Sequence, residues 1–375
     1  MTYESRGLAR ALCYNFPVAR EAGSIETDRF LKACWGEPHD TVPVWFMRQA
    51  GRYQPSYRAL RSRYTMLEMA RTPHLIRDVT VRPVVDLGVD AAIIFSDIMI
   101  PLEFLGVAFD IVEHVGPKVF SPIRDGTGVS RLTPFFAEGP DYVYEGIRLA
   151  VAELGSIPLI GFAGAPFTLA SYLVEGGPSR TYHWTKRLMW TDAAAFHALM
   201  EILAEMVSQF LARQVAAGAR AVQLFDSWVG ALNVRDFATW VLPAIRTIVR
   251  QLTPLGVPII YFALEAYHLL PLIADIGVTV VGVDWRGELS EVRRLMGSQV
   301  GIMGNLDPQR VTLGTEAALA GTEEILRNMR SDPRFIFNLG HGVPPETDPA
   351  VLQAVVQRVH DEGHVAGLAG KENQP

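Results

Sequence analysis

Eight short apolar runs recur along the chain, and their spacing is the feature that most constrains its fold. Each run has the length of a β-strand and is almost continuously apolar, which is typical of a strand buried on both faces. The runs cover residues 43–46, 91–95, 158–162, 221–225, 258–262, 278–282, 300–303 and 335–337. Strands of this kind belong to parallel sheets that are covered by helices.

The segments between the runs carry helix punctuation, with Thr or Asp at their starts and Gly at their ends. The clearest examples are 72–88, 191–218 and 348–363, and a further helix is expected over 25–34. Residues 191–218 show a helical period, with apolar side chains three, four or seven residues apart at Phe196, Leu199, Leu203, Met206, Phe210 and Ala217. That stripe is interpreted as core.

Alternation of strands and helices predicts an α/β fold, and we favour a single-domain (β/α)8 TIM barrel over a doubly wound open sheet. A length of 375 residues accommodates such a barrel with insertions. We expect an N-terminal extension over 1–24, the barrel over 25–365 and a flexible tail over 366–375. The segment 111–131 reads as an inserted hairpin. In a barrel the active site lies at the C-terminal mouth of the strands.

Composition restricts the class of protein. Hydrophobic residues make up 49% and charged residues 20%, as in ordinary globular proteins, and no apolar run approaches the length of a membrane helix. The net charge is −6, and there is no long basic run, which disfavours nucleic acid as a partner. Two cysteines, Cys13 and Cys34, lack zinc-binding spacing. We expect a cytoplasmic protein that does not associate with membranes.

The first apolar run is followed by an arginine cluster. Residues 41–67 contain five arginines and no acidic residue, although the protein is acidic overall. Arg48 and Arg52 flank a glycine directly after the run, where guanidinium groups can bind carboxylates or phosphates through paired hydrogen bonds. The other three are interpreted as a solvated helix face: Arg58, Arg61 and Arg63.

Polar side chains follow the other runs, at the ends that would form the barrel mouth. Asp97 is the single charge between residues 91 and 101, so an apolar rim is expected around it. His341 lies between two glycines. Either ligand binding or a structural role fits the rest, which are Tyr172, Asp226, Ser227, Glu265, Asp284, Asn305 and Asp307.

Several motifs resemble those of the uroporphyrinogen decarboxylase family. The chain contains, in order, PVWFMRQAGRYQPSYR, IIFSDIMIP, GFAGAPFTLASYLVEGG, LFDSWVG, GNLDP and FNLGHGVPPETDP. The resemblance implies a (β/α)8 homodimer without metal or organic cofactor. Its implied activity is removal of the four acetate carboxyls of uroporphyrinogen III, which gives coproporphyrinogen III and CO₂ in haem and chlorophyll biosynthesis.

The resemblance also implies roles for individual residues. Arg48 and Arg52 would bind substrate carboxylates, and Asp97 would accept the pyrrole N–H groups. The propionate or acetate arms would contact Tyr172, Ser227 and His341. Asp97 and Arg48 are the expected catalytic residues, and the proton donor is either Arg48 or Asp97 with a bound water.

Two positions depart from the family pattern. Leu264 and Glu265 stand where a Lys-Gly pair is expected, and Trp228 stands where His is more frequent. The alternative function is a zinc- and cobamide-dependent methyltransferase of the same superfamily. Such enzymes need cysteines at strand ends to hold zinc, and both cysteines here precede the first apolar run. A tetrapyrrole carrier without catalysis is a third hypothesis.

Overall fold

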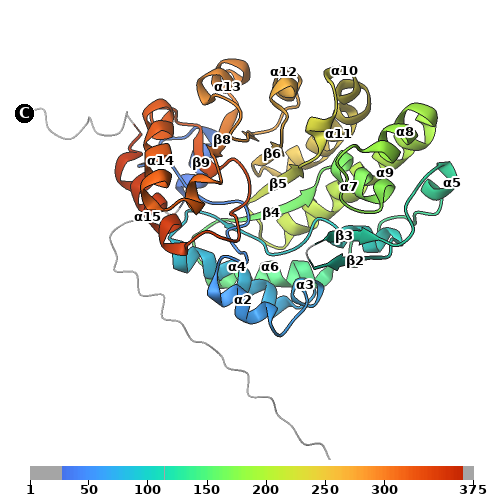
Figure 1. Ribbon diagram of the computed structural model, residues 1–375, viewed down its shortest axis with the longest axis horizontal. Coiled ribbons are helices and arrows are strands. Elements are labelled where there is room, and N and C mark those ends of the chain that lie inside the picture. Colours follow the sequence, from blue (N-terminus) through green and yellow to red (C-terminus); the bar gives the residue numbers. More distant parts are fainter. Residues whose placement is uncertain (1–27, 114, 366–375) are drawn as a thin grey trace, which may run out of the picture.

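Seven parallel strands form one curved sheet in the computed structural model, which describes residues 28–113 and 115–365. Helices lie along the outer side of the sheet (Figure 1). The strands are β1 (Ala92–Ile93), β4 (Leu159–Gly164), β5 (Ala221–Asp226), β6 (Ile259–Ala263), β7 (Val280–Gly282), β8 (Gly301–Leu306) and β9 (Phe335–Leu339). Each corresponds to one predicted apolar run. The expected extension over 1–24, the tail over 366–375 and Cys13 lie outside the described residues.

The order of the strands across the sheet is the same as their order along the chain, from β1 through β4 to β9. Every neighbouring pair in this sheet is parallel. In a doubly wound sheet, the order in which successive strands are added across the sheet would reverse part-way. The sheet is therefore singly wound, and the doubly wound alternative is wrong.

Every connection between successive strands of this sheet contains at least one helix, as the alternation in the sequence predicts. The helices are α1 (Arg29–Trp35), α2 (Pro55–Arg61), α3 (Met66–Ala70), α4 (Pro73–Leu87), α5 (Gly126–Val129), α6 (Asp141–Leu154), α7 (Pro166–Glu175), α8 (His183–Thr191), α9 (Ala193–Ala216), α10 (Val234–Asp236), α11 (Leu242–Leu252), α12 (Leu270–Ile273), α13 (Leu289–Met296), α14 (Thr315–Met329) and α15 (Pro349–Glu362).

The predicted helix ends are confirmed where cap residues carried the signal. The α4 helix ends at Gly88, which adopts the left-handed conformation with φ 75° that glycine allows. The side chain of Asp192 accepts a hydrogen bond from the first turn of α9, and Asp348 does the same for α15. The helix expected over 25–34 is α1, and residues 25–27 lie outside the described part of the chain.

One described helix, α9, is long and apolar enough to cross a membrane by length and composition alone. It has 24 residues, and 61% of its most apolar window is buried inside the molecule. The predicted stripe from Phe196 to Phe210 is part of the buried core. The apolar character of α9 is therefore explained by packing against the sheet and its neighbouring helices.

The predicted insertion contains an antiparallel hairpin, β2 (Phe109–Val112) and β3 (Gly116–Val119). It begins two residues before the expected segment and is tied to the end of α7, because Val119 N donates to the Gly176 carbonyl at 2.9 Å. This hydrogen bond connects the hairpin, which follows β1 in the sequence, to the end of α7.

The first apolar run differs from the prediction, because residues 43–46 form an isolated bridge rather than a strand. Val44 pairs in parallel with Phe337 of β9, and Phe337 N donates to the Pro43 carbonyl at 2.9 Å. On the other side, Asp90 N donates to the Val44 carbonyl at 2.8 Å. The run thus lies between the two edges of the sheet without continuing its ladder.

Side chains replace the missing backbone ladder beside this run. Pro43 has no N–H, and Val44 N donates to the Asp90 carboxylate at 2.8 Å. The Gln49 amide accepts from Phe46 N at 3.2 Å and donates to the Ala91 carbonyl at 3.1 Å. Backbone groups of the run are therefore satisfied by side chains, which shortens the regular strand to a single bridge.

The Asp90 carboxylate joins segments that are distant in the sequence. Besides Val44 N, it accepts from Arg29 Nη1 at 3.1 Å, and His360 Nε2 lies 2.8 Å from its Oδ2 atom. Arg29 and Asp90 are buried. A buried carboxylate is stable only when its oxygens are paired in this way. Asp90 thus links α1, the first apolar run and α15.

Replacing Asp90 by Asn should lower the free energy of unfolding by about 3 kcal/mol, because the buried Arg29 loses the buried one of its two carboxylate partners and keeps only Asp40. Urea denaturation of the two proteins would measure the difference. The matched control is Glu145→Gln, which removes an exposed ion pair with Arg148 and should change stability far less. Equal effects of the two substitutions would contradict the central role of Asp90.

Candidate active site

Arg48 is positioned by a tight turn that follows the first apolar run. Its backbone has φ 57°, in the left-handed region that non-glycine residues rarely occupy. The turn is held by buried Gln49, whose carbonyl accepts a 2.6 Å hydrogen bond from the Tyr53 hydroxyl. Such a conformation persists only where the surroundings fix it, and it is frequent at functional sites.

The Arg48 side chain lies against Gly342, at the end of β9. A Cβ atom at position 342 would be 2.4 Å from Arg48 Cδ, so the guanidinium stem occupies space that only a glycine leaves open. His341 therefore stands beside Arg48. The glycine after His341 is explained by this close approach. From the sequence alone, both ligand binding and a structural turn were possible explanations for the glycines around His341.

Asp97 follows β1 and is half-buried. Its Oδ1 atom accepts from Met99 N at 2.9 Å. Burial raises the pKa of the Asp97 carboxyl, whereas this hydrogen bond and the nearby charge of Arg48 lower it. Asp97 makes no ion pair within the described part of the chain. Its remaining oxygen is therefore able to accept from a ligand.

Neither Arg48 nor Arg52 makes a side-chain hydrogen bond or ion pair to the residues that the structure describes, and both are exposed. Arg52 and Asp97 both influence the pKa of Tyr57, which burial raises. Arg52 therefore lies on the same side of the molecule as Asp97. Arg58 instead donates to the carbonyls of Arg52 and Tyr53, which fits its predicted structural role.

Tyr172 of α7 shares the electrostatic environment of Asp97 and Arg48. Burial raises the pKa of Tyr172, the charge of Asp97 raises it further, and Arg48 opposes both effects. The phenol is therefore protonated at neutral pH and can donate to a carboxylate. Its ring stacks on Trp228 with centroids 3.9 Å apart and planes 33° apart.

His341 follows β9 and faces Phe262, with ring centroids 6.3 Å apart. Burial, and to a smaller extent the Arg48 charge, lower the pKa of His341 to about 4, and Asp284 opposes the shift. The imidazole is therefore neutral at pH 7. It can both donate and accept a hydrogen bond without adding charge beside Arg48.

The structure thus places Arg48 near enough to influence the pKa values of Asp97, Tyr172 and His341, and it places Asp97 near enough to influence that of Tyr172. Ser227 follows directly after Asp226 at the end of β5. Within the described residues its hydroxyl makes no protein hydrogen bond. Its place at the mouth therefore rests on its position in β5.

The other polar residues at the strand ends have protein partners. Asp226 is buried and accepts from Thr168 Oγ1 and Tyr261 OH, each at 2.7 Å. Burial raises the pKa of Asp226 to about 6, and these hydrogen bonds oppose the shift. Asp307 caps its own turn through Gln309 N at 2.9 Å. Both carboxylates are thus structural.

Sequence reasoning missed a charged cluster after β6 and β7. Arg286 donates to Glu265 Oε1 at 2.9 Å and to Asp284 Oδ2 at 3.3 Å, and its guanidinium lies 4.2 Å from the centre of the Trp285 ring. Glu265 has a left-handed backbone with φ 56°. The only signal in the sequence was that Glu265 stands where the family pattern has glycine, the residue that tolerates this conformation.

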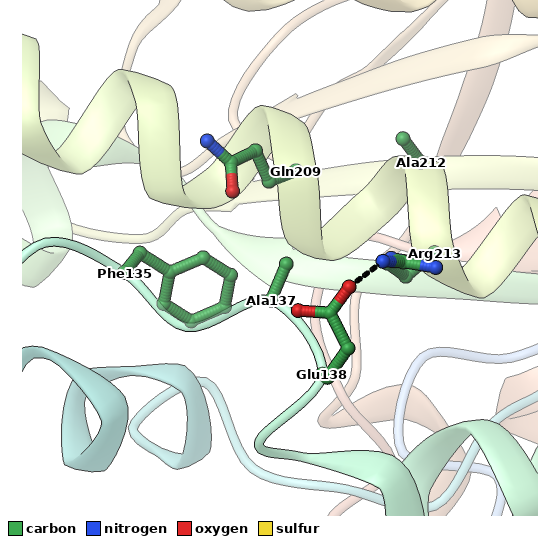
Figure 2. Close-up of a pocket in the computed structure, with 6 residues that line it drawn as sticks. All are labelled: Phe135, Ala137, Glu138, Gln209, Ala212 and Arg213. Atoms are coloured by element: carbon green, nitrogen blue, oxygen red, sulfur yellow. Dashed lines mark hydrogen bonds and ion pairs between the residues drawn. The ribbon is translucent and has the colours of Figure 1, made fainter.

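A pocket of about 410 Å³ lies away from these residues, between α9 and the loop before α6 (Figure 2). It is lined by Phe135, Ala137, Glu138, Gln209, Ala212 and Arg213, and the ion pair between Glu138 and Arg213 crosses it. None of the predicted site residues lines it. Among the described residues, no group of three or more His, Cys, Asp or Glu side chains could hold a metal ion.

These observations describe an α/β protein with exposed Arg48 after the first apolar run and partly buried Asp97 after β1. The family model described as uroporphyrinogen decarboxylase (URO-D) matches residues 26–362. Uroporphyrinogen decarboxylase from Sorangium cellulosum is 49% identical over 89% of this chain and 96% of that protein. Uroporphyrinogen decarboxylase from Salinispora tropica is 48% identical over 88% of this chain and 90% of that protein.

A solved methyltransferase from Methanosarcina mazei has the same fold, with a TM-score of 0.76 and 18% identity over 89% of this chain and 98% of that chain. The chain belongs to the uroporphyrinogen decarboxylase family. The resemblance seen in the sequence motifs is therefore confirmed.

The pKa of His341 should depend on the positive charge of nearby Arg48. In the parent protein its pKa is about 4, and Arg48→Gln should raise that value because a nearby positive charge is removed. NMR titration of the histidine ring signals, assigned with a His341→Gln variant, measures the change. Arg58→Gln, on the exposed face of α2, should leave the value unaltered; a pKa unaffected by Arg48→Gln would contradict the described contact.

Proposed function

We propose that this chain removes the four acetate carboxyls of uroporphyrinogen III and gives coproporphyrinogen III and CO₂, a step of haem and chlorophyll biosynthesis. The observation that carries the proposal is the proximity of exposed Arg48 to partly buried Asp97, neither of which makes an ion pair with a described residue. The substrate has carboxylates for the arginine and pyrrole N–H groups for the aspartate.

The reaction requires a place for the electrons that CO₂ leaves behind. Protonation of the pyrrole α-carbon next to the carbon that bears the acetate gives a cationic ring, and the C–C bond pair flows into that ring as CO₂ departs, which leaves an exocyclic methylene. A second proton on the new exocyclic carbon makes the methyl group, and loss of the first proton restores the aromatic pyrrole. The ring supplies the electron sink, so no organic cofactor or metal is needed.

Asp97 would stabilise the cationic ring by accepting its N–H groups, and its apolar surroundings strengthen this interaction. Burial of Asp97 raises its pKa and so disfavours its charged form, and the positive charge of Arg48 reduces this effect. Arg48 would hold the reacting carboxylate. The proton comes either from Arg48, although a guanidinium releases protons reluctantly, or from Asp97 through a bound water.

The remaining residues would bind the substrate arms as neutral donors. Tyr172 stays protonated and His341 stays uncharged at neutral pH, so both can donate to carboxylates without repelling Arg48. Arg52 and Ser227 would bind further arms. A substrate with eight carboxyl groups requires several such positions around the mouth.

Several finer features are part of the same proposal. We infer that residues 43–46 act as the eighth strand of a closed (β/α)8 barrel, supported by the bridge between Val44 and Phe337. We further propose that residues 25–365 form one domain, and that the protein is a cytoplasmic homodimer that uses neither metal nor organic cofactor. These features are supported by the motifs shared with the family.

The methyltransferase alternative is less well supported. Cys34 lies buried in α1, and burial raises the pKa of its thiol, so the thiolate that binds zinc is disfavoured. The likeness to a solved methyltransferase, at 18% identity, concerns the fold alone. A carrier without catalysis would bind the product tightly and release no CO₂.

The direct test is anaerobic incubation of the purified, metal-stripped protein with uroporphyrinogen III, followed by chromatography of the oxidised products. We expect carboxyl groups to be lost in steps until the four-carboxyl porphyrin remains. An unchanged eight-carboxyl porphyrin would refute the proposal, and a methyl-transfer assay with zinc restored would then test the alternative.

Asp97→Asn should keep the fold and lower the turnover number by on the order of 100-fold, because the charge that stabilises the cationic ring is lost. The same chromatographic assay measures the rate. Asp110→Asn, in the exposed hairpin strand β2, is the matched control and should retain parental turnover. Turnover by the Asp97 variant at near the parental rate would exclude the central role given to this carboxylate.

A further inference from the structure

Three aromatic rings form a cluster beside the proposed site, which we call the aromatic stack: Tyr172, Trp228 and Tyr182. Trp228 lies between the two tyrosines, with ring centroids 3.9 Å from Tyr172 and 5.4 Å from Tyr182. Tyr172 comes from α7, Trp228 follows β5 and Tyr182 precedes α8. The stack thus joins the segments that follow two neighbouring strands.

The backbone of Trp228 is fixed relative to the helix that carries Tyr172. Trp228 N donates to Thr168 Oγ1 at 3.3 Å, and Thr168, one turn before Tyr172 on α7, donates to buried Asp226 at 2.7 Å. The loop after Trp228 is held by Lys186 Nζ, which donates to the Ala231 carbonyl at 2.8 Å. The backbone that carries the indole is therefore held relative to α7 and α8.

The hydroxyl of Tyr172 makes no hydrogen bond to a described residue, so protein contacts at its ring decide where it points. The plane of the Tyr172 ring is only 33° from that of Trp228, which is a tilted face contact rather than an edge contact. Tyr182 contacts the indole at a steep 60° and supports it on another side. Rotation of the Tyr172 ring would require Trp228 to move.

We propose that Trp228 is a positioning residue for the decarboxylation, which holds the Tyr172 hydroxyl toward the substrate carboxylate that it binds. This role rests on the proposed function. It gives meaning to Trp228, a position where the sequence resemblance favoured histidine, because histidine has a smaller ring and would cover less of Tyr172. Trp228 acts through Tyr172 and not by contact with the reacting atoms.

The experiment compares Trp228→Leu and Trp228→Phe in the parent protein and in a Tyr172→Phe background, with uroporphyrinogen III as substrate. Trp228→Leu should raise KM about 3- to 10-fold, the range expected for one lost aromatic pair, and should change kcat less than about twofold. Trp228→Phe keeps a ring and should restore KM to within about twofold of the parent.

In the Tyr172→Phe background, Trp228→Leu should have almost no further effect on KM, because the hydroxyl that the indole positions is already absent. An equal increase in both backgrounds would overturn the proposal and indicate that Trp228 acts independently of that hydroxyl. No increase in the parent background would overturn it as well.

Two controls separate this role from general damage and from failure of the proposed function. Trp190→Leu removes an exposed indole of α8 outside the aromatic stack and should leave KM unchanged. If Trp228→Leu lowers the thermal midpoint, Trp228→Tyr provides a second ring-retaining variant with the expected KM near the parent. Failure of the proposed function would appear in the parent protein itself, whereas failure of the positioning role appears only between variants.

Discussion

One buried carboxylate connects the first apolar run to the first and last described helices. Asp90 accepts hydrogen bonds from the backbone of the first apolar run and from Arg29, and it lies beside His360 of the last helix. The two ends of the described chain are brought together at this point. Arg48 follows the same run, and His341 follows the strand that pairs with it. Arg48 and His341 therefore both follow segments that this bridge brings together.

The electrostatics of the site follow from a balance between burial and one exposed cation. Burial raises the pKa of Asp97 and lowers that of His341, and Arg48 opposes the first shift and reinforces the second. One guanidinium thus favours the charged form of the acid and the neutral form of the imidazole.

Sequence patterns predicted what depends on local chemistry, namely the seven strands, the capped helices and the isolated charge of Asp97. They missed what depends on contacts between distant segments. The first run has a strand-like composition, but its ladder is replaced by the Asp90 and Gln49 side chains. Arg286 resembles any surface arginine until the fold places it between Glu265 and Trp285. The left-handed backbone of Arg48 could not be predicted, because no glycine stands at that position.

The side-chain closure beside the first run has a consequence for how this fold tolerates mutation. Backbone ladders form with almost any side chain, so the inner strands can exchange one apolar residue for another of similar volume. At the seam between the first run and β1, hydrogen bonds depend on two particular side chains, Asp90 and Gln49. Sequence drift is therefore more constrained at this seam than in the middle of the sheet, although both are equally buried.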